Sequence, residues 1–223
     1  MFERCELLIG KENVLKLKKK KVLVIGLGGV GGYTVESLVR SGIENITIVD
    51  YDTIATSNIN RQIIATNKNI GKLKTDAFEE RIKDINPNCN VIKENVFLNT
   101  DNIESIIDNY DYVIDACDTI TAKKEIIRVC ITKNIHFITC LGTGKRLDPT
   151  KLSIIDLKDT SYDPIAKILR KYVKDNYPKE KIKVLYSSEI PLDTDSKDIP
   201  SMIFVPASAG ILLANYVILE LLK

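Results

Sequence analysis

A glycine-rich loop near the N-terminus constrains the fold of this chain more than any other feature. The loop reads GLGGVGG over residues 26–32 and follows an apolar run at residues 22–25. Its first glycine permits a tight turn, its second lets backbone N–H groups approach phosphates, and its third lets the following helix pack on the strand. The helix N-terminus adds about half a positive charge. We expect a phosphate cradle formed by Gly26, Gly28, Gly29 and Gly31.

The rest of the first half alternates short apolar runs with segments of helical spacing. Strands are expected near residues 22–25, 46–49, 91–92, 112–114 and 136–139, and helices near residues 29–41, 72–86, 103–109 and 121–133. Such alternation indicates parallel strands joined by right-handed crossovers. The sequence therefore predicts an α/β fold with a Rossmann-like, doubly wound and mainly parallel sheet.

The pattern changes after Gly142, which indicates a C-terminal α+β extension of the same domain. We expect a strand at residues 152–157, a helix starting at Asp163-Pro164, a strand at 183–186 and a loop at 192–200. A last helix at about residues 208–222 is apolar on nearly all sides. This predicts that it is buried in the core or in a subunit interface.

Composition limits the class of protein. At 223 residues and 44% hydrophobic, the chain can bury one core, and we expect no run that reaches the roughly 20 apolar residues of a membrane span. With a charged N-terminus, this predicts a cytoplasmic protein without a span. The net charge of +2 means that a nucleic-acid surface requires local clustering. The cysteines are odd in number and widely spaced, which predicts reduced thiols: Cys5, Cys89, Cys117, Cys130 and Cys140.

Charged residues after the loop indicate which nucleotide it binds. Asp50 ends the second predicted strand, where a carboxylate accepts hydrogen bonds from ribose hydroxyls or simply occupies a turn. Loop and acid alone fit a nicotinamide-dependent dehydrogenase equally well. Arg61 and Lys74 follow, and fixed cations suit a triphosphate because a departing pyrophosphate carries charge that must be neutralised.

A further acid follows the strand that ends at Ile114. Asp118 is expected at the carboxyl edge of the sheet, where ligands of open α/β folds bind. Mg²⁺ typically takes one or two carboxylates together with phosphate oxygens and water. We therefore predict that Asp118 holds Mg²⁺, with Asp115 as a second candidate.

These motifs together resemble those of a known superfamily. The loop, then DYD at residues 50–52, SNINRQ at 57–62, GKLK at 71–74 and DACD at 115–118 are similar to the ThiF, MoeB and HesA superfamily of ubiquitin-activating-like enzymes, which adenylate carboxylates. Within it, the chain most resembles the tRNA threonylcarbamoyladenosine dehydratases. That similarity includes RCELLIG at 4–10, INPNC at 85–89, Asp-Pro at 148–149 and 163–164, YSSE at 186–189 and FVP at 204–206.

The resemblance implies ATP and Mg²⁺ as cofactors and a role for each matching residue. Arg61, Lys74, Asp118 and Arg4 would be catalytic, with Asp118 also holding the metal. The implied nucleotide-binding residues are Gly26, Gly28, Gly29, Gly31, Asp50, Asp52, Asn58, Arg61 and Lys74. Residues 1–145 would form the ATP-binding, adenylating region. Residues 146–223 would supply substrate-side and dimer elements.

The implied activity is the ATP-dependent dehydration, by cyclisation, of N6-threonylcarbamoyladenosine in tRNA through carboxylate adenylation. One alternative is an adenylyltransferase that activates the C-terminal glycine of a ubiquitin-like sulfur carrier; another is a nucleotide sensor. Arg4 matches an arginine that enters the neighbouring subunit's site in relatives, which implies a homodimer. The chain departs from the pattern at Phe2, where relatives usually carry another arginine after a longer lead, and it lacks paired CxxC motifs. A sulfur-relay protein partner is left open.

Several other residues have competing interpretations. Residues 167–183 carry seven basic and two acidic side chains, which fits either a solvated helix face or an RNA surface. Lys145 and Arg146 follow the turn at 142–144 and are expected to meet the substrate. Residues 16–21 are interpreted as a charged lead into the first strand. Cys117, Cys140 and the single histidine, His136, are assigned to the core or to a strand end and not to catalysis.

Overall fold

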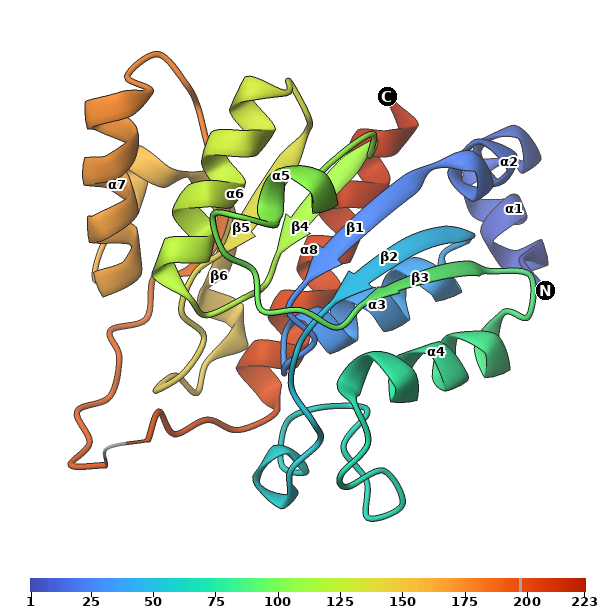
Figure 1. Ribbon diagram of the computed structural model, residues 1–223, viewed down its shortest axis with the longest axis horizontal. Coiled ribbons are helices and arrows are strands. Elements are labelled where there is room, and N and C mark those ends of the chain that lie inside the picture. The colour runs from blue at the N-terminus through green and yellow to red at the C-terminus, as the bar shows by residue number, and fades with distance from the viewer. Residues whose placement is uncertain (197) are drawn as a thin grey trace.

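One seven-stranded sheet forms the centre of the computed structural model, which describes residues 1–196 and 198–223 (Figure 1). Its strands lie in the order β3-β2-β1-β4-β5-β7-β6, and all pairs are parallel except β6 with β7. The strands are β1 Lys21–Ile25, β2 Asn45–Val49, β3 Asn90–Glu94, β4 Tyr112–Asp115, β5 Phe137–Cys140, β6 Leu152–Asp156 and β7 Lys183–Ser187. The predicted doubly wound α/β fold is confirmed, and the two C-terminal strands extend the same sheet.

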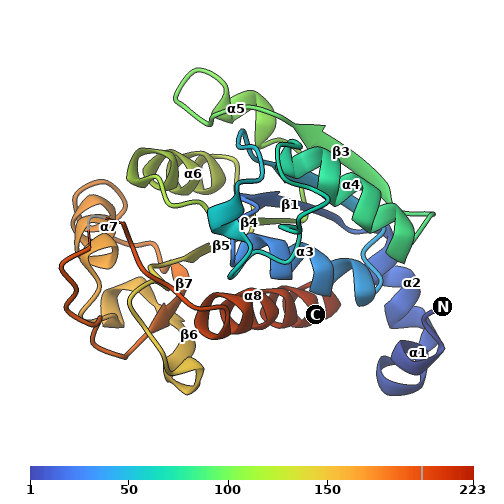
Figure 2. The same ribbon diagram turned by 90° about the horizontal axis from the view of Figure 1, so that it is seen from below.

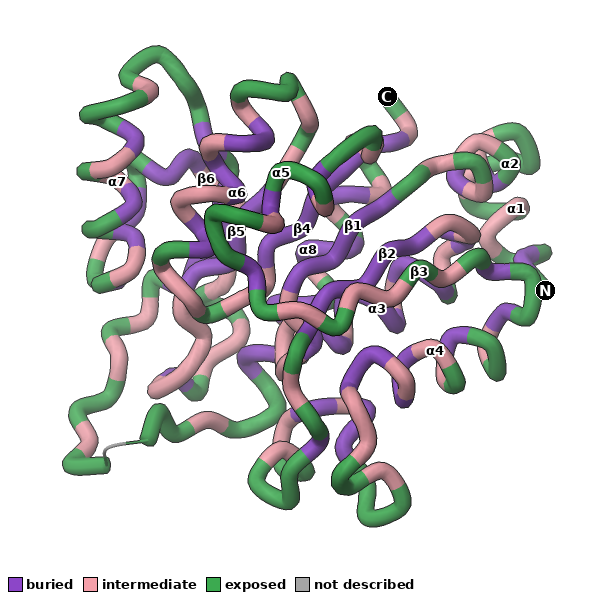
Figure 3. Tube along the Cα trace, viewed as in Figure 1, coloured by how far each residue is buried: buried purple, intermediate pink, exposed green. Residues whose placement is uncertain are grey.

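Helices cover both faces of this sheet (Figure 2). They are α1 Glu3–Ile9, α2 Lys11–Lys19, α3 Gly31–Arg40, α4 Lys74–Ile85, α5 Ile103–Ile106, α6 Ile120–Thr132, α7 Pro164–Asn176 and α8 Phe204–Leu222. Successive residues of β1 point to opposite faces, as the pleat requires. Val22 and Val24 pack with α3, α4 and α8, whereas Leu23 and Ile25 pack with α5 and α6. The central strands β1, β2, β4 and β5 are accordingly buried, except at the first residue of β1, β2 and β5 (Figure 3).

The N-terminal segment differs from its prediction. Residues 16–19 were expected to be a charged lead, but they form the last turn of α2. This helix is rich in lysine, and its buried residues are Val14 and Leu17. Three apolar positions in nine residues, Val14, Leu15 and Leu17, are a weak periodic signal, so the pattern did not indicate a helix.

The last helix packs on α3, as its apolar sequence predicts. Ala209, Leu213 and Val217 are buried in the core, whereas Ile211 and Leu219 are about half exposed. By length and composition alone, α8 could cross a membrane, with a mean hydropathy of 1.7 over its window. The expectation that no stretch reaches this length was therefore wrong. Core helices of globular domains pass the same test, and α8 is packed as one.

The carboxyl ends of the parallel strands all face one edge of the sheet. Two long connections extend beyond that edge, at the bottom of Figure 1: residues 50–73 after β2, which contain the short 3₁₀ helix Thr56–Asn58, and residues 188–203 between β7 and α8. The predicted loop at 192–200 lies in the second connection, except residue 197, which is outside the described residues. These connections frame the site.

Candidate functional site

A cavity of about 910 Å³ opens at the carboxyl edge of the sheet. Its walls come from the glycine loop, the ends of β2, β4 and β5, and both long connections. The predicted residues that line it are Gly26, Gly28, Gly29, Asp50, Asp52, Asn58, Arg61, Lys74 and Asp118. Residues from five separate motifs therefore meet in one cavity.

The glycines of the loop have different geometric reasons to be glycine. Gly26 has φ 88°, and a Cβ there would lie 2.8 Å from the backbone of Ala116 and Cys117. A Cβ on Gly31, the first residue of α3, would overlap the carbonyl oxygen of Gly26. At Gly28, by contrast, the nearest neighbour is Gln62 Nε2 at 3.9 Å. Gly26 and Gly31 are thus required by the fold, whereas Gly28 leaves open space in the cavity.

Two carboxylates place a buried lysine beside the loop. Asp50 accepts hydrogen bonds from Leu27 N at 2.7 Å and from Asp52 N at 2.9 Å. Lys74, at the start of α4, places Nζ 2.6 Å from Asp52 Oδ2 and 3.5 Å from Asp50 Oδ2. Because a carboxylate offers about four lone-pair sites, Asp50 retains capacity for further donors. The lysine charge is held beside the glycine loop.

Arg61 lies directly on the glycine loop. Its Cγ is 3.5 Å from the position that a Cβ on Gly29 would take. Its Nη1 donates to Ser57 O at 2.8 Å and to Asn60 Oδ1 at 2.9 Å. Among the described residues it has no carboxylate partner, so its charge is not neutralised. Asn58 accepts a hydrogen bond from Ala55 N at 3.0 Å and stabilises the turn that carries Arg61.

A buried glutamine of this cavity was not singled out by the sequence. Gln62 is 7% exposed, and its Oε1 has no hydrogen-bond partner among the described residues. It faces Gly28. A buried amide oxygen without a partner is costly in free energy, so a ligand that donates a hydrogen bond here would remove an existing penalty.

Asp118 is an exposed carboxylate beyond β4, and it lines the cavity. In the described part of the chain it has no basic partner; its one side-chain contact is with Thr119 Oγ1 at 3.4 Å. No group of three potential metal ligands occurs among the described residues. A single free carboxylate fits a cation that takes its other ligands from phosphates and water.

A buried ion pair supports the turn that carries Asp118. Lys123 Nζ lies 3.0 Å from Asp115 Oδ2 and donates to the carbonyl oxygen of Cys140 at 2.7 Å, and both charged side chains are at most 1% exposed. The other carboxyl oxygen of Asp115 accepts from Cys117 N at 3.1 Å and from Cys117 Sγ at 3.0 Å. Asp115 is therefore buried inside the protein, and it does not line the cavity. It is not available as the second metal candidate.

The cysteines near the cavity are poor nucleophiles. Burial, and then the Asp115 carboxylate, raises the pKa of Cys117 well above its usual value. Burial also raises the pKa of Cys140 to about 12. A thiol with a raised pKa stays protonated near neutral pH, and the thiolate is the reactive form. This agrees with the prediction that neither thiol is catalytic.

An aromatic pair forms the wall next to β2. The rings of Tyr51 and Phe97 meet edge to face with centroids 5.0 Å apart, and Val96 and Leu98 continue this apolar surface. Asp52, followed by burial and Asp118, raises the pKa of Tyr51, so its hydroxyl stays neutral. Val96, Phe97 and Leu98 belong to no motif, and only the fold shows that they face the cavity beside Tyr51.

The opposite half of the cavity is formed by residues 141–146 and the start of α7. Arg146, expected to meet the substrate, is 3% exposed. It donates to the carbonyl oxygens of Gly142 and Glu189 and lies 3.5 Å from Asp163 Oδ2. Asp163 in turn caps α7 through Ala166 N at 2.9 Å. Arg146 lines the cavity, but its guanidinium is occupied in holding this loop, so a contact with the substrate stays a prediction.

Lys145 remains as the cation of this half. It lines the cavity and has φ 61°, an unusual value for a residue other than glycine. Its N–H donates to Pro200 O, and its carbonyl accepts from Leu192 N, both at 2.8 Å. The backbone of Lys145 therefore ties Leu192 and Pro200 of the second long connection to the cavity wall.

Two predicted or considered residues lie away from this cavity. Arg4 is exposed on α1 and does not line it, so a role in a partner's site stays a prediction. His136 is exposed just before β5, at the opposite edge of the sheet, where it stacks on Tyr112 at 6.2 Å. It cannot act as a base in this cavity.

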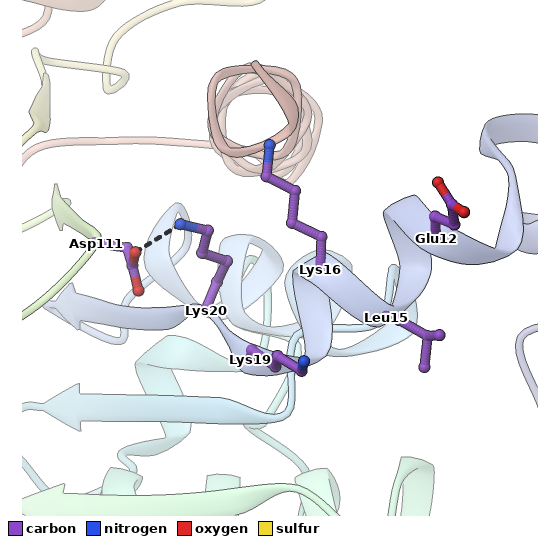
Figure 4. A pocket seen from close by; sticks show the side chains of 6 residues that line it. All are labelled: Glu12, Leu15, Lys16, Lys19, Lys20 and Asp111. Atoms are coloured by element: carbon purple, nitrogen blue, oxygen red, sulfur yellow. Dashed lines mark hydrogen bonds and ion pairs between the residues drawn. The ribbon is translucent and has the colours of Figure 1, made fainter.

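A second hollow of about 520 Å³ lies beside α2 (Figure 4). Two of its three lysines have partners inside the protein: Lys20 pairs with Asp111 at 2.7 Å, and Lys16 donates to Leu222 O at 3.0 Å. It contains none of the predicted site residues. The larger cavity is therefore the candidate active site.

Comparisons with known proteins agree with this site. A family model described as the ThiF family matches residues 3–162. The tRNA threonylcarbamoyladenosine dehydratase of Bacillus subtilis (strain 168) is 37% identical over 240 residues, covering 100% of this chain and 94% of that protein. The adenylyltransferase and sulfurtransferase UBA4 of Vanderwaltozyma polyspora is 38% identical over 150 residues, but these cover 67% of this chain and 34% of that protein.

Solved structures extend the similarity to the whole fold. The E. coli tRNA N6-threonylcarbamoyladenosine dehydratase TcdA in complex with AMP superimposes with a TM-score of 0.93 at 31% identity, covering 98% of this chain and 92% of that one. The same enzyme in complex with ATP gives a TM-score of 0.93, covering 99% and 93%. This chain therefore belongs to the ThiF family, in the branch of the tRNA threonylcarbamoyladenosine dehydratases.

Proposed function

We propose that this protein uses ATP to dehydrate N6-threonylcarbamoyladenosine in tRNA, through adenylation of the threonyl carboxylate. The observation that carries the proposal is the convergence of Arg61, Lys74 and Asp118 on the glycine loop in one cavity. A protein that only senses a nucleotide needs binding, whereas two fixed cations and a free acid suit a reaction in which phosphate charge moves. Relatives that match the whole chain carry the same activity in their names.

The nucleotide would lie across the half of the cavity next to β1 and β2. Its base would rest on the apolar wall of Tyr51 and Phe97, and its ribose would meet Asp50. Its phosphates would pass over Gly28 toward Arg61 and Lys74, with Asn58 and Asp52 at their side. Mg²⁺, held by Asp118, would neutralise phosphate charge.

The reaction would proceed in two steps. One carboxylate oxygen of the threonyl group attacks the α-phosphorus of ATP, and the bond from that phosphorus to the bridging oxygen breaks to release pyrophosphate. Arg61 and Lys74 stabilise the charge that develops on the departing group. An atom of the adjacent ureido group then attacks the acyl carbon, closes a ring and releases AMP. The tRNA loses one water in total, while ATP becomes AMP and pyrophosphate.

This scheme requires no nucleophile from the protein. Ring closure is intramolecular, and well-oriented intramolecular reactions reach effective molarities of about 10⁵ M or more. The raised pKa of Cys117 is consistent with this, because its thiol is neutral during the reaction. The residues around Lys145 and Asp163 would have the task of orienting the substrate.

A cytoplasmic homodimer with shared sites completes the proposal. Leu7 and Leu8 of α1 are 88% and 85% exposed, and Ile211 and Leu219 of α8 are also open to solvent. Large apolar side chains at the surface are typical of subunit interfaces. Arg4 lies on the same short helix as the two leucines, so an interface there would bring Arg4 to a second copy.

The direct test is mass spectrometry of nucleosides after incubation of threonylcarbamoyl-modified tRNA with the protein, ATP and Mg²⁺. The expected product is lighter by one water and is absent with Asp118→Ala. An unchanged nucleoside with a folded protein that binds ATP would contradict the proposal.

The UBA4 similarity supports a second candidate, the adenylation of a sulfur-carrier C-terminus, because both reactions need the same nucleotide residues. The two differ in the acceptor. Pyrophosphate exchange that depends on a protein ending in glycine, and not on modified tRNA, would favour the sulfur-carrier activity. It would also identify a sulfur-relay protein as the partner.

A further inference from the structure

Three lysines form a row along one side of α7. Lys167, Lys171 and Lys174 are spaced by four and three residues, which places them on one face of a helix, and all three are exposed. The opposite side of α7 supplies Ala166, Leu169 and Val173 to the core. We call Lys167, Lys171 and Lys174 the α7 lysine row.

The charges of this row are free, unlike those of many other lysines in the protein. Lys18, Lys20, Lys72, Lys93, Lys133 and Lys223 each lie within 4.0 Å of an acidic side chain. Over the described residues, the three lysines of the row have no such partner. Residues 164–183 carry a net charge of +5 in a chain of +2, so the remainder of the chain is at −3. The positive charge of the chain is therefore concentrated in residues 164–183.

The row also begins at the cavity. The start of α7 lines the half of the cavity that we propose for the substrate, through Asp163, Pro164 and Ile165. From there α7 runs along the outer edge of the molecule toward the opposite edge of the sheet (Figures 1 and 2). At 1.5 Å per residue, the row covers about 10 Å of helix. Lys145 adds a cation on the cavity wall.

We propose that the α7 lysine row binds phosphates of the RNA strand whose modified nucleotide occupies the cavity. This inference rests on the proposed function. A nucleotide that enters a cavity is splayed out of its loop, and its flanking phosphates stay at the rim. Free lysines beside that rim match the charge of those phosphates, and contacts of this kind position a strand without reading its sequence.

The test compares two triple variants. One replaces Lys167, Lys171 and Lys174 with glutamine; the matched control replaces Lys11, Lys19 and Lys21, which are exposed at α2 and the start of β1 and have no acidic partner among the described residues. Affinity for threonylcarbamoyl-modified tRNA is measured from about 50 to 300 mM salt. Melting curves and ATP binding establish that each variant is folded.

The row variant should bind tRNA about tenfold or more weakly at low salt, with the slope of log affinity against log salt reduced by about 2 to 3. The control should retain the slope, and arginine at the three positions of the row should restore it. ATP affinity should be unchanged in all variants.

Equal slopes in the row variant and the wild type, or an equal loss in the control, would overturn the inference. So would a row variant that keeps its RNA affinity but loses binding to an acidic protein. These outcomes require a wild-type protein that dehydrates tRNA. If the wild type itself leaves the nucleoside unchanged, the proposed function has failed instead, and the two failures are thus distinguished.

Discussion

The two halves of the cavity are built in different ways. In the half that we propose for the nucleotide, next to β1 and β2, the glycine loop and charged residues shortly after strand ends face the cavity. Two of these charged residues, Arg61 and Asp118, have no ion-pair partner among the described residues. In the substrate half, Arg146 and Asp163 are buried and bind each other and the loop backbone. Charge faces the ligand in the first half and stabilises the wall in the second.

This difference between the two halves indicates what the charged side chains do in each. A triphosphate needs neutralisation of its own charge, so exposed cations in the cavity interact with it directly. A substrate that reacts within itself needs orientation, which depends on a rigid wall. We therefore expect substitutions in the first half to affect ATP chemistry and those in the second half to affect the use of tRNA.

The largest expected effect comes from the buried pair beneath the nucleotide half. Lys123→Met leaves Asp115 as a buried carboxylate without its cation, which should lower the free energy of unfolding by about 3–5 kcal/mol. Unfolding in denaturant measures this free energy. The double variant Lys123→Met with Asp115→Asn removes both charges and should recover a large part of the loss. No recovery would mean that packing of the lysine stem, and not its charge, holds the turn.

Next in size is the loss of the phosphate cation. Arg61→Met retains a linear stem over Gly29 but removes the guanidinium, so the rate of adenylation should fall on the order of 10²- to 10³-fold with little change in melting temperature. Single-turnover formation of AMP in the presence of modified tRNA measures this step. An Arg61→Met variant that forms AMP at the normal rate but binds tRNA more weakly would contradict the division of roles between the two halves of the cavity.

A pair of glycine variants tests the roles within the loop. Gly31→Ala should destabilise the protein by about 1–3 kcal/mol, because the added methyl group overlaps the Gly26 carbonyl. Gly28→Ala should melt normally but bind ATP on the order of tenfold more weakly, since its methyl group enters open space. Calorimetry of unfolding and of ATP binding gives both values. If Gly28→Ala lowered the stability and Gly31→Ala lowered the affinity for ATP, the phosphates would have to bind elsewhere on the loop.

The smallest effect is expected in the substrate half. Glu189 accepts hydrogen bonds from Leu147 N and Asp148 N at 3.0 Å each. Glu189→Gln should cost about 1 kcal/mol of stability and raise KM for tRNA a few-fold, with KM for ATP unchanged. Steady-state kinetics with each substrate varied in turn separates the two. A rise in KM for ATP alone would argue against a substrate role for this wall.

The fold and the nucleotide half could largely be predicted from local sequence. The glycine loop, Arg61, Lys74 and Asp118 belong to short motifs or follow strand ends, so their position follows from the order of the strands. Lys123 could not be recognised, because it looks like any helix lysine until tertiary packing brings Asp115 and Cys140 to it.

For the same reason, the sequence did not indicate that the guanidinium of Arg146 holds the loop. Its burial depends on Asp163, 17 residues further on, and on the carbonyl of Glu189, 43 residues further on. Neither contact has a periodic or motif signal. Tyr51 and Phe97 likewise come together only through the neighbouring ends of β2 and β3.

The packing of α8 on α3 has a consequence for the order of folding. A Cβ on Gly210 would come within about 3 Å of Val30 and Thr34, and Thr34 Oγ1 donates to the carbonyl of Gly210 across 176 residues of sequence. On a ribosome, residues 30–34 emerge long before residue 210. The helix that presents the glycine loop therefore stays uncovered during most of synthesis, and the nucleotide site gains its full support only when the final segment of the chain docks.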